Sequence, residues 1–306
     1  MNEKIFDCIV IGGGAAGLSA ALVLGRSRRD TLVIDENHPR NSVTRASHGF
    51  LSRDGITPGE FKEISLEQLK KYPTVLYEQD RVENVVKPDF TFKVTTNKGK
   101  VYQSKKVIFS TGMKDDLPSI KGLKEVYGTS VYPCPYCDGW ERRDKKLAVF
   151  GNGDWLMHYA KMIYNWSNDL IVFTNGAAEI TTNEKKELMD HGVQLVEQPI
   201  VELKSTNGQL ENVIVESGES YERTDGFIMD TGETQACDIP LKLGIELIEM
   251  GGYKVNEKGE TTINGLYIIG DAKNAFSGLI KAASEGYELG AIMNGEMVIE
   301  AWENTN

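Results

Sequence analysis

The sequence predicts an α/β fold built from two similar units, in each of which an apolar strand leads through a glycine-rich turn into a helix. The first unit starts at residues 6–11 and the second at residues 146–150, and each continues into another apolar strand. The chain has 306 residues, and single hydrophobic cores stop growing at about 250–300 residues. Two domains are therefore expected, each with parallel strands joined by crossover helices.

The composition of the chain limits its partners. Asp and Glu number 45 against 34 Lys and Arg, which leaves a net charge of -11. This charge repels the phosphates of nucleic acids and the headgroups of anionic lipids, so we expect neither nucleic acid nor a membrane as a partner. The 4 cysteines are too few for a disulfide scaffold. We expect a cytoplasmic protein in which a close cysteine pair does redox or metal chemistry.

Residues 6–35 form the first candidate nucleotide site, because they read as strand, glycine turn, helix and strand. The turn has the spacing Gly12-x-Gly14-x-x-Gly17, and the second strand ends on Asp35. Gly12 permits the tight turn, Gly14 leaves room for a pyrophosphate, and Gly17 lets the helix pack closely on the strand. The helix N-terminus attracts phosphate, and Asp35 can accept hydrogen bonds from ribose. A turn in a nucleotide-free sheet is the alternative, but the combination favours a dinucleotide site.

The other expected elements follow in order along the chain. Helices are expected at residues 61–71, 155–166 and 279–301. Strands are expected between residues 82 and 94 and at 107–109, 146–150, 170–173, 193–196, 213–215, 227–229 and 266–269. Residues 37–59 are too polar and irregular for a core element.

Cys134-Pro135-Tyr136-Cys137 is the close cysteine pair of the sequence, and Asp138 and Gly139 follow it directly. Two thiols at this spacing can form a disulfide, and one of them can become a thiolate that attacks an external disulfide. Structural zinc needs four ligands, and the sequence offers no second cysteine pair to complete the set, so no metal is expected. A purely structural disulfide is the remaining alternative to redox activity.

The order of these motifs resembles that of the low-molecular-weight thioredoxin reductases, a class of pyridine nucleotide-disulfide oxidoreductases, over nearly the whole chain. The matching motifs are Gly12-x-Gly14-x-x-Gly17, Ser110-Thr111-Gly112, Cys134-x-x-Cys137-Asp138-Gly139, Gly151-x-Gly153-Asp154 and Gly270-Asp271. The resemblance implies two Rossmann-like dinucleotide-binding domains of the three-layer ββα type, the second inserted in the first. It implies an FAD-binding domain at residues 1–112 and 233–306. An NAD(P)H-binding-like domain with the cysteines would occupy residues 113–232, with hinges at Met113 and residues 232–233.

The resemblance also implies a homodimeric flavoprotein disulfide reductase with FAD as cofactor and thioredoxin or a similar disulfide as partner. In that reading Cys137 exchanges electrons with the flavin, Cys134 attacks the partner disulfide and Asp138 is the acid/base. Asp271 would hold the ribityl chain of FAD. The residues expected at the cofactor are Gly12, Gly14, Ala15, Ala16, Asp35, Glu36, Arg40, Asn41, His48, Thr111, Gly112, Gly270 and Asp271.

The second nucleotide site departs from the family's pattern. Gly151, Gly153 and Asp154 match, but Trp and Leu follow Asp154 where the family has Ser and Ala. Residues 174–176 read Thr-Asn-Gly in place of a His-Arg-Arg cluster that holds the 2′-phosphate of NADPH. Because a 2′-phosphate needs Arg or Lys, the sequence does not support a preference for NADPH. It leaves NADPH, NADH or neither as the nucleotide.

Three features resemble a sub-branch that includes the gliotoxin- and holomycin-type dithiol oxidases. They are residues 47–55, the Cys-Pro-Tyr-Cys form of the pair, and Trp140-Glu141. In those enzymes electrons run from a small dithiol through the cysteines and FAD to oxygen, and His48 is a candidate base or flavin contact. The alternatives are therefore a dithiol oxidase, a reductase with a non-nicotinamide electron donor, and a non-enzymatic flavin redox sensor.

Overall fold

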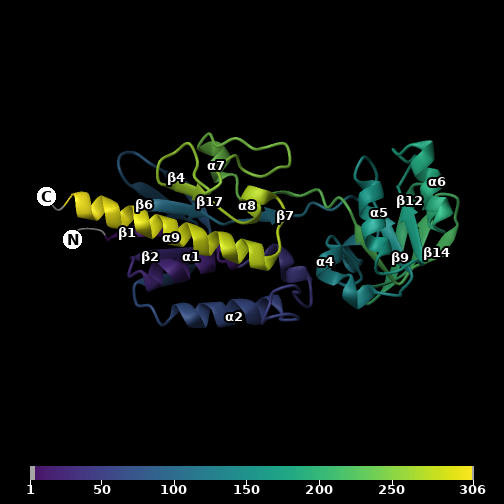
Figure 1. Ribbon diagram of the computed structural model, residues 1–306, viewed down its shortest axis with the longest axis horizontal. Helices are drawn as coiled ribbons and strands as arrows, with labels where there is room; N and C mark the ends of the chain where they lie inside the picture. The colour runs from purple at the N-terminus through teal and green to yellow at the C-terminus, as the bar shows by residue number, and fades with distance from the viewer. Residues whose placement is uncertain (1–3, 305–306) are drawn as a thin grey trace. The chain divides into compact units, whose positions relative to one another are not determined.

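The computed structural model describes residues 4–304 and divides the chain into two compact units (Figure 1). Unit 1 contains the described residues up to Ser42, Gly49–Lys114, and the described residues from Thr234 onward. Unit 2 contains Val43–His48 and Asp115–Glu233. In sequence, unit 2 is therefore inserted into unit 1. The short segment Val43–His48 groups with unit 2, which no sequence pattern indicated.

A seven-stranded sheet forms the centre of unit 1, in the order β3-β2-β1-β6-β5-β4, with β17 also paired to β6. Its strands are β1 (Ile5–Ile11), β2 (Thr31–Asp35), β3 (Val75–Gln79), β4 (Val82–Val86), β5 (Phe92–Thr96), β6 (Val101–Phe109) and β17 (Leu266–Ile268). The main helices are α1 (Ala15–Arg26), α2 (Pro58–Leu69) and α9 (Leu279–Glu303). The shorter elements are η1 (Arg40–Val43), β7 (Met113–Lys114), β16 (Thr234–Gln235), α7 (Ile239–Lys242) and α8 (Asp271–Asn274). β5 pairs antiparallel with both β4 and β6, and the other pairs of the large sheet are parallel.

The apolar strands of unit 1 bury both of their faces. Cys8 and Val10 of β1 pack in one core with residues of α1 and α9, such as Leu289. Ile9 and Ile11 point to the opposite face and belong to a second core, which includes residues of β4 and β5. Because side chains alternate along a strand, one run of apolar residues supplies both cores. Unit 1 therefore has three layers.

Unit 2 repeats this plan around a five-stranded parallel sheet in the order β11-β10-β9-β15-β8. Its strands are β8 (Val131–Tyr132), β9 (Leu147–Phe150), β10 (Leu170–Phe173), β11 (Gln194–Val196) and β15 (Asp225–Ile228). An antiparallel sheet contains β12 (Ile200–Thr206), β13 (Gln209–Val215) and β14 (Ser220–Glu222). The helices are α3 (Leu123–Val126), α4 (Pro135–Asp138), η2 (Trp140–Arg142), α5 (Leu156–Tyr164) and α6 (Thr182–Asp190).

The two faces of β9 show how the layers of unit 2 are held. Leu147 and Val149 pack with residues of α5 and α6, whereas Ala148 and Phe150 pack with residues of the antiparallel sheet, such as Leu203. The predicted class, two three-layer Rossmann-like domains with the second inserted in the first, is confirmed. Of the strands, β3, β7, β8, β12, β14 and β16 were not predicted from the sequence. Among the longer helices, α6 was missed, although Thr181 and Glu184 form a capping box at its start.

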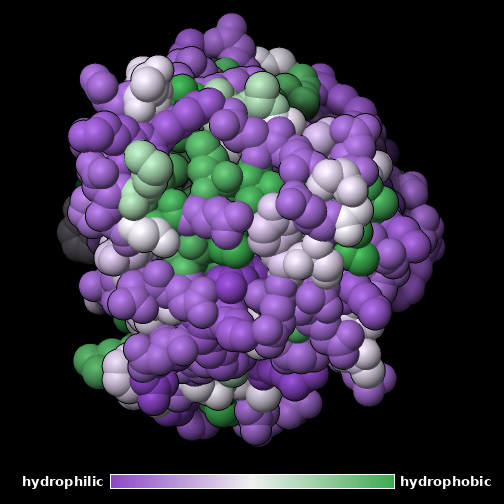
Figure 2. All heavy atoms as spheres, turned by 90° about the vertical axis from the view of Figure 1, so that its right-hand side faces the viewer, coloured by the Kyte–Doolittle hydropathy of each residue, from purple (hydrophilic) through white to green (hydrophobic). Residues whose placement is uncertain are grey.

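No helix within residues 4–304 has the length and apolar character needed to cross a membrane. Figure 2 shows one face of the molecule, on which hydrophilic residues predominate and hydrophobic residues gather in one area of the upper half.

Close packing of α1 on α9 holds the helix that follows the first glycine turn. The two helices lie side by side (Figure 1). A Cβ atom at Gly286 would lie 2.0 Å from the carbonyl oxygen of Ala16, and one at Gly290 would lie 2.9 Å from Cβ of Val23. Glycine at these positions therefore permits the backbone of α9 to approach α1.

We predict that Gly286→Ala lowers the free energy of unfolding by about 2 kcal/mol, because the new methyl group has no room beside Ala16. Gly295 is the matched control, since it lies in the same helix and a Cβ atom there meets nothing within 4 Å. Gly295→Ala should raise the free energy of unfolding by about 0.5–1 kcal/mol through helix propensity. Urea denaturation measures both values. Equal effects of the two substitutions would contradict the packing account.

Candidate active site

The first glycine turn has the geometry that its spacing predicted. Gly12 has φ +105°, and a Cβ atom there would lie 2.5 Å from the carbonyl oxygen of Ser110. A Cβ atom at Gly17 would lie 2.1 Å from the carbonyl oxygen of Gly12. At Gly14, by contrast, a Cβ atom would meet nothing within 4 Å, and no side chain caps the helix that starts at Ala15. The turn therefore leaves open space in front of the positive end of α1.

Asp35 lies buried at the end of β2, where it is held by three donors. The Gly13 amide donates to its Oδ1 at 3.0 Å, and Tyr77 and Lys62 donate to its Oδ2 at 2.9 and 2.5 Å. Burial alone would raise the pKa of Asp35, but these donors more than offset it and hold the pKa below its ordinary value. Asp35 is therefore a fixed carboxylate. The sequence analysis identified neither Lys62 nor Tyr77.

Thr111 Oγ1 and Gln235 Oε1 are among the buried oxygen atoms of unit 1 that have no hydrogen-bond partner in the protein. The amide of Gln235 is fixed by donation to the carbonyl oxygens of Gly251 and Ala272, at 2.8 and 3.0 Å. Buried polar atoms are nearly always hydrogen-bonded, so these two oxygens fit a site for a polar ligand. Thr111 is among the residues predicted at the cofactor, whereas no sequence motif contains Gln235.

Asp271 begins α8 and is partly buried. Ser277 Oγ donates to its Oδ1 at 2.7 Å. Burial raises the pKa of Asp271, and Ser277 and the charge of Arg40 oppose this effect. Arg40 also donates to the carbonyl oxygen of Ala275 at 3.4 Å. Arg40 and Asp271, which are far apart in the sequence, are therefore close enough for their charges to interact.

Most of the predicted cofactor residues follow the carboxyl ends of parallel strands in unit 1. Gly12 follows β1, Asp35 ends β2, Thr111 follows β6 and Gly270 follows β17. The carboxyl ends of parallel strands meet at one edge of a sheet, which is where α/β folds bind nucleotides. Gly14, Ala15, Ala16, Glu36, Gly112 and Asp271 lie within a few residues of these ends. Arg40 and Asn41 lie in η1.

The cysteine pair lies in unit 2, where Cys134 and Cys137 form a disulfide with their Cα atoms 5.2 Å apart. Cys134 caps the short helix α4, and its Sγ accepts a hydrogen bond from the Cys137 amide at 3.2 Å. Such a donor stabilises a thiolate at Cys134 after reduction. Gly139 follows α4. A Cβ atom there would lie 2.4 Å from the carbonyl oxygen of Pro135, so a larger residue would clash with the turn.

Asp138 follows the pair directly and is 8% exposed. Burial raises its pKa to about 7, while the charges of Arg142 and His48 lower it and that of Glu141 raises it. A carboxyl group with this pKa exchanges its proton near neutral pH. The position and the pKa both suit the predicted acid/base role.

His48 belongs to the segment Val43–His48, which groups with unit 2. It does not belong to unit 1, which contains the first glycine turn. Its Nε2 lies 3.7 Å from Oε1 of Glu141, an ion pair when the histidine is protonated. His48 is therefore close to the end of the cysteine segment, and a flavin contact stays a prediction. Among residues 4–304, no three His, Cys, Asp or Glu side chains gather as a metal site would require.

The second glycine turn follows β9, and the side chain of Asn152 closes it. Asn152 Oδ1 accepts from the amides of Gly153 and Glu179 at 3.0 and 2.8 Å, and its Nδ2 donates to the carbonyl oxygen of Ala177 at 2.9 Å. The Gly153 amide is therefore already satisfied. A Cβ atom at Gly153 would lie 3.8 Å from a carboxylate oxygen of Glu179, which repels phosphate.

The residues after β10 supply no cation to this turn, as residues 174–179 contain neither Lys nor Arg. Thr174 Oγ1 donates to the carbonyl oxygen of Gly176, and Asn175 Oδ1 accepts from the Ile200 amide at 2.7 Å. Asp154 and Trp155 are exposed at the start of α5. The predicted second site is thus present as a turn but lacks the cationic pocket for a 2′-phosphate.

We predict that Asp138 governs the pH dependence of the cysteine thiols. In the reduced protein, ionisation of Asp138 near pH 7 adds a negative charge beside the thiols, so their alkylation rate should follow a broadened pH profile. Asp138→Asn should narrow this profile, because only the two thiols then ionise. Asp144→Asn removes an exposed carboxylate nearby and should leave the broadened profile intact. An equally broad profile in Asp138→Asn would contradict the assignment.

Known proteins resemble this chain over most of its length. The family model for pyridine nucleotide-disulphide oxidoreductases matches residues 6–288. A protein of Arthroderma benhamiae named "Probable thioredoxin reductase" is 33% identical over 304 residues, which cover 89% of this chain and 75% of that protein. Thioredoxin reductase aclD of Aspergillus oryzae is 30% identical over 305 residues, with 95% of each chain covered.

A solved structure gives the same result. The crystal structure of TrxB from Bacillus anthracis superposes with a TM-score of 0.92 at 38% identity and covers 97% of this chain and 99% of that one. The resemblance, the enzyme class and the FAD dependence predicted from the sequence are therefore confirmed. The chain belongs to the pyridine nucleotide-disulphide oxidoreductase family, as an FAD-dependent enzyme of the thioredoxin reductase type.

Proposed function

We propose that the protein is a disulfide reductase in which Cys134 and Cys137 pass an electron pair from FAD to thioredoxin or a similar disulfide. The observation that carries this proposal is the Cys134–Cys137 disulfide followed by a buried Asp138 with a pKa near 7. A structural disulfide needs no such acid beside it. A carboxyl group that exchanges its proton at neutral pH serves thiol–disulfide exchange, in which protons move with the electron pair.

In unit 1, the edge of the sheet at the carboxyl ends of β1, β2, β6 and β17 fits FAD. We assign the residues that follow these parallel strands to that cofactor. Gly14 leaves room for the pyrophosphate at the start of α1, and Asp35 offers a fixed carboxylate to a ribose. The partnerless oxygens of Thr111 and Gln235 and the partly buried Asp271 suit the polar parts of the cofactor. The bound flavin supplies the two-electron chemistry that side chains lack. Unit 2 is then the NAD(P)H-binding-like domain of the enzyme.

The exchange with an external disulfide proceeds in two balanced steps. Reduced Cys134 attacks one sulfur of the substrate, so that a mixed disulfide forms and the substrate's own S–S bond breaks. Cys137 then attacks Cys134 Sγ, which restores the Cys134–Cys137 disulfide and releases the substrate as a dithiol with two more electrons and two more protons. Asp138 passes protons at the sulfur atoms during these steps.

Cysteine variants test the proposal. Cys137→Ser should keep the yellow FAD but lower disulfide turnover by about 1000-fold or more, because one half of the redox couple is gone. Cys134→Ser should leave Cys137 able to give a long-wavelength absorbance band as a thiolate against the flavin. Cys237→Ser is the control, because this free thiol has no assigned role, and it should retain turnover. Unchanged turnover in Cys137→Ser would overturn the proposal.

The partner and the cellular setting follow from the same proposal. We expect a thioredoxin-like protein or a small disulfide as the substrate, a homodimer as the working form, and a cytoplasmic location where thiols are kept reduced. The expectation about the substrate is supported by the relatives, which are named thioredoxin reductases.

The second glycine turn favours a second candidate function, a dithiol oxidase that transfers electrons from a small dithiol through the cysteines and FAD to oxygen. Asn152 already holds the Gly153 amide, and Glu179 stands beside the turn where a 2′-phosphate would need a cation. A poor nicotinamide site would slow a reductase that takes its electrons from NADPH. It would not affect an oxidase, which takes its electrons from the dithiol. A reductase fed by another electron carrier is compatible with the same observation.

Anaerobic rapid mixing separates these candidates. We predict that NADPH bleaches the flavin no faster than NADH, and that Glu179→Lys raises the rate with NADPH relative to NADH more than Glu179→Gln does. Rapid bleaching by either nicotinamide would identify a nicotinamide-dependent reductase. Bleaching by a reduced dithiol alone, with recovery in air, would identify an oxidase. A strong preference of the unmodified protein for NADPH would contradict the account of the second turn.

A further inference from the structure

The side-chain amide of Gln235 has only one orientation that its surroundings allow. Gln235 lies in β16, and its Nε2 donates to the carbonyl oxygens of Gly251 and Ala272 at 2.8 and 3.0 Å. If the amide were turned over, its oxygen would face these two carbonyl oxygens, and acceptors repel each other. The amide oxygen Oε1 is therefore fixed in its place, where it is buried and has no hydrogen-bond partner in the protein.

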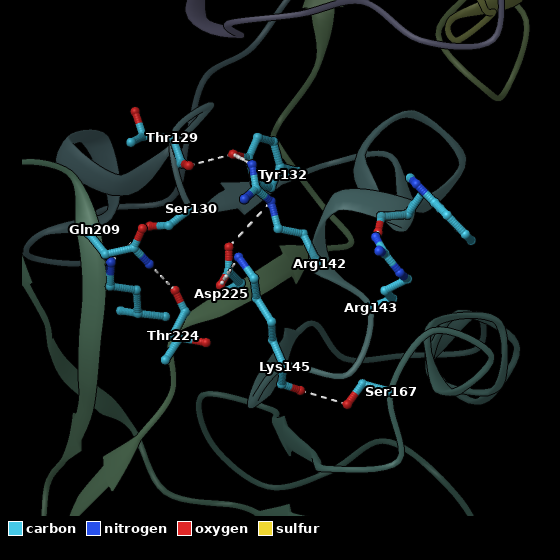
Figure 3. A network of polar contacts seen from close by, with 12 residues as sticks. Thr129, Ser130, Tyr132, Arg142, Arg143, Lys145, Ser167, Gln209, Thr224 and Asp225 are labelled. Carbon is cyan, nitrogen blue, oxygen red and sulfur yellow. Dashed lines mark hydrogen bonds and ion pairs between the residues drawn. The ribbon is translucent and has the colours of Figure 1, made fainter. Parts of the chain in front are cut away.

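The unpartnered atoms of Asp225 and Arg142 in unit 2 are of a different kind (Figure 3). Both carboxylate oxygens of Asp225 and Nε of Arg142 are buried without a hydrogen bond. Arg142 Nε lies 3.3 Å from Oδ1 of Asp225, however, and Lys145 Nζ lies 3.2 Å from Oδ2. The attraction of opposite charges compensates these atoms within the protein. Gln235 carries no charge, so its buried oxygen needs a hydrogen-bond donor.

Gln235 connects two segments that are predicted at the cofactor. The next residue, Ala236, donates its amide to the carbonyl oxygen of Gly112 at 3.1 Å. Through its own side chain, Gln235 contacts Ala272, which directly follows Asp271 in α8. Figure 1 shows β7, which pairs with β16, next to α8. The unpartnered oxygen therefore belongs to the edge of unit 1 that fits FAD.

The donors of FAD at this place are those of its riboflavin half. The family resemblance assigns Asp271 to the ribityl chain, and Gln235 contacts the residue beside Asp271. The ribityl chain carries O–H donors, and the flavin ring has an N–H donor at N3. The phosphates of FAD offer only acceptors at neutral pH, so they would repel an amide oxygen.

We propose that Gln235 binds FAD: its Oε1 accepts a hydrogen bond from an O–H or N–H donor of the riboflavin half, while its Nε2 stays on the protein backbone. This inference rests on the assignment of FAD to unit 1 under the proposed function. The carbonyl oxygens of Gly251 and Ala272 fix the amide before FAD binds, so little side-chain freedom is lost on binding.

Dissociation constants of FAD and its analogues for the full-length protein test this inference without turnover. One analogue is methylated at N3 of the flavin, others each lack one ribityl hydroxyl, and a further one lacks a hydroxyl of the adenosine ribose. In the unmodified protein, the analogue without the donor to Gln235 should bind about 10-fold more weakly than FAD, because a buried acceptor loses its hydrogen bond. In Gln235→Met this ratio should disappear, since the acceptor is absent.

A purely structural role of Gln235 would weaken the binding of FAD and of every analogue alike, so the ratios would not change. Gln68→Met is the matched control, because Gln68 is exposed in α2 of the same unit. It should leave the FAD affinity and all ratios unchanged. If Gln235→Met does not fold, Gln235→Asn decides the question, because its amide is one methylene shorter and its oxygen does not reach the same donor.

Ratios that are unchanged for every analogue in Gln235→Met or Gln235→Asn would overturn the inference. A change confined to the analogue altered in the adenosine ribose would also overturn it, because Gln235 would then lie at the other end of the cofactor. Neither result would affect the cysteine assignment, which depends on the turnover of Cys137→Ser. Conversely, unchanged turnover in Cys137→Ser would remove the proposed function even if the ratios change as expected.

Discussion

Parallel pairing of the strands is the constraint on which both sites depend. In unit 1 the segments after β1, β2, β6 and β17 share one edge because these strands run in the same direction. Unit 2 obeys the same rule: the cysteine segment follows β8 and the second glycine turn follows β9, both strands of one parallel sheet. The sheets therefore bring residues from distant parts of the chain to one edge. The loops after the strands determine which functional side chains and amides lie there.

The two glycine turns show how loops diverge on one scaffold. The turn before α1 keeps open space at Gly14, whereas the amide of Gly153 in the second turn is used by Asn152. A turn that satisfies its own amides no longer needs an anion, and Glu179 adds a carboxylate nearby. The same fold thus holds one turn suited to a dinucleotide and another whose electrostatics oppose a 2′-phosphate. Because an oxidase needs no NADPH, this difference is compatible with an oxidase as well as with a reductase.

Local patterns predicted the two glycine turns, the cysteine pair and most strands, because a run of buried residues or a fixed spacing is visible in a short stretch of sequence. Contacts between distant residues were not predictable in this way. The donors Lys62 and Tyr77 of Asp35, the partnerless Gln235 and the Arg142–Asp225 pair bring together residues that share no motif. Helix α6 was missed although its capping box is visible at Thr181, because its residues are mostly polar.

The central claim is that the Cys134–Cys137 disulfide stores an electron pair in addition to that of the flavin. Anaerobic titration with dithionite, followed by flavin absorbance and by counting of free thiols, measures this directly. The account predicts that each chain takes up two electron pairs and gains the thiols of Cys134 and Cys137, whereas a variant with both cysteines replaced by serine takes up one pair. Equal uptake by the two proteins, with the disulfide intact in the reduced flavoprotein, would contradict it.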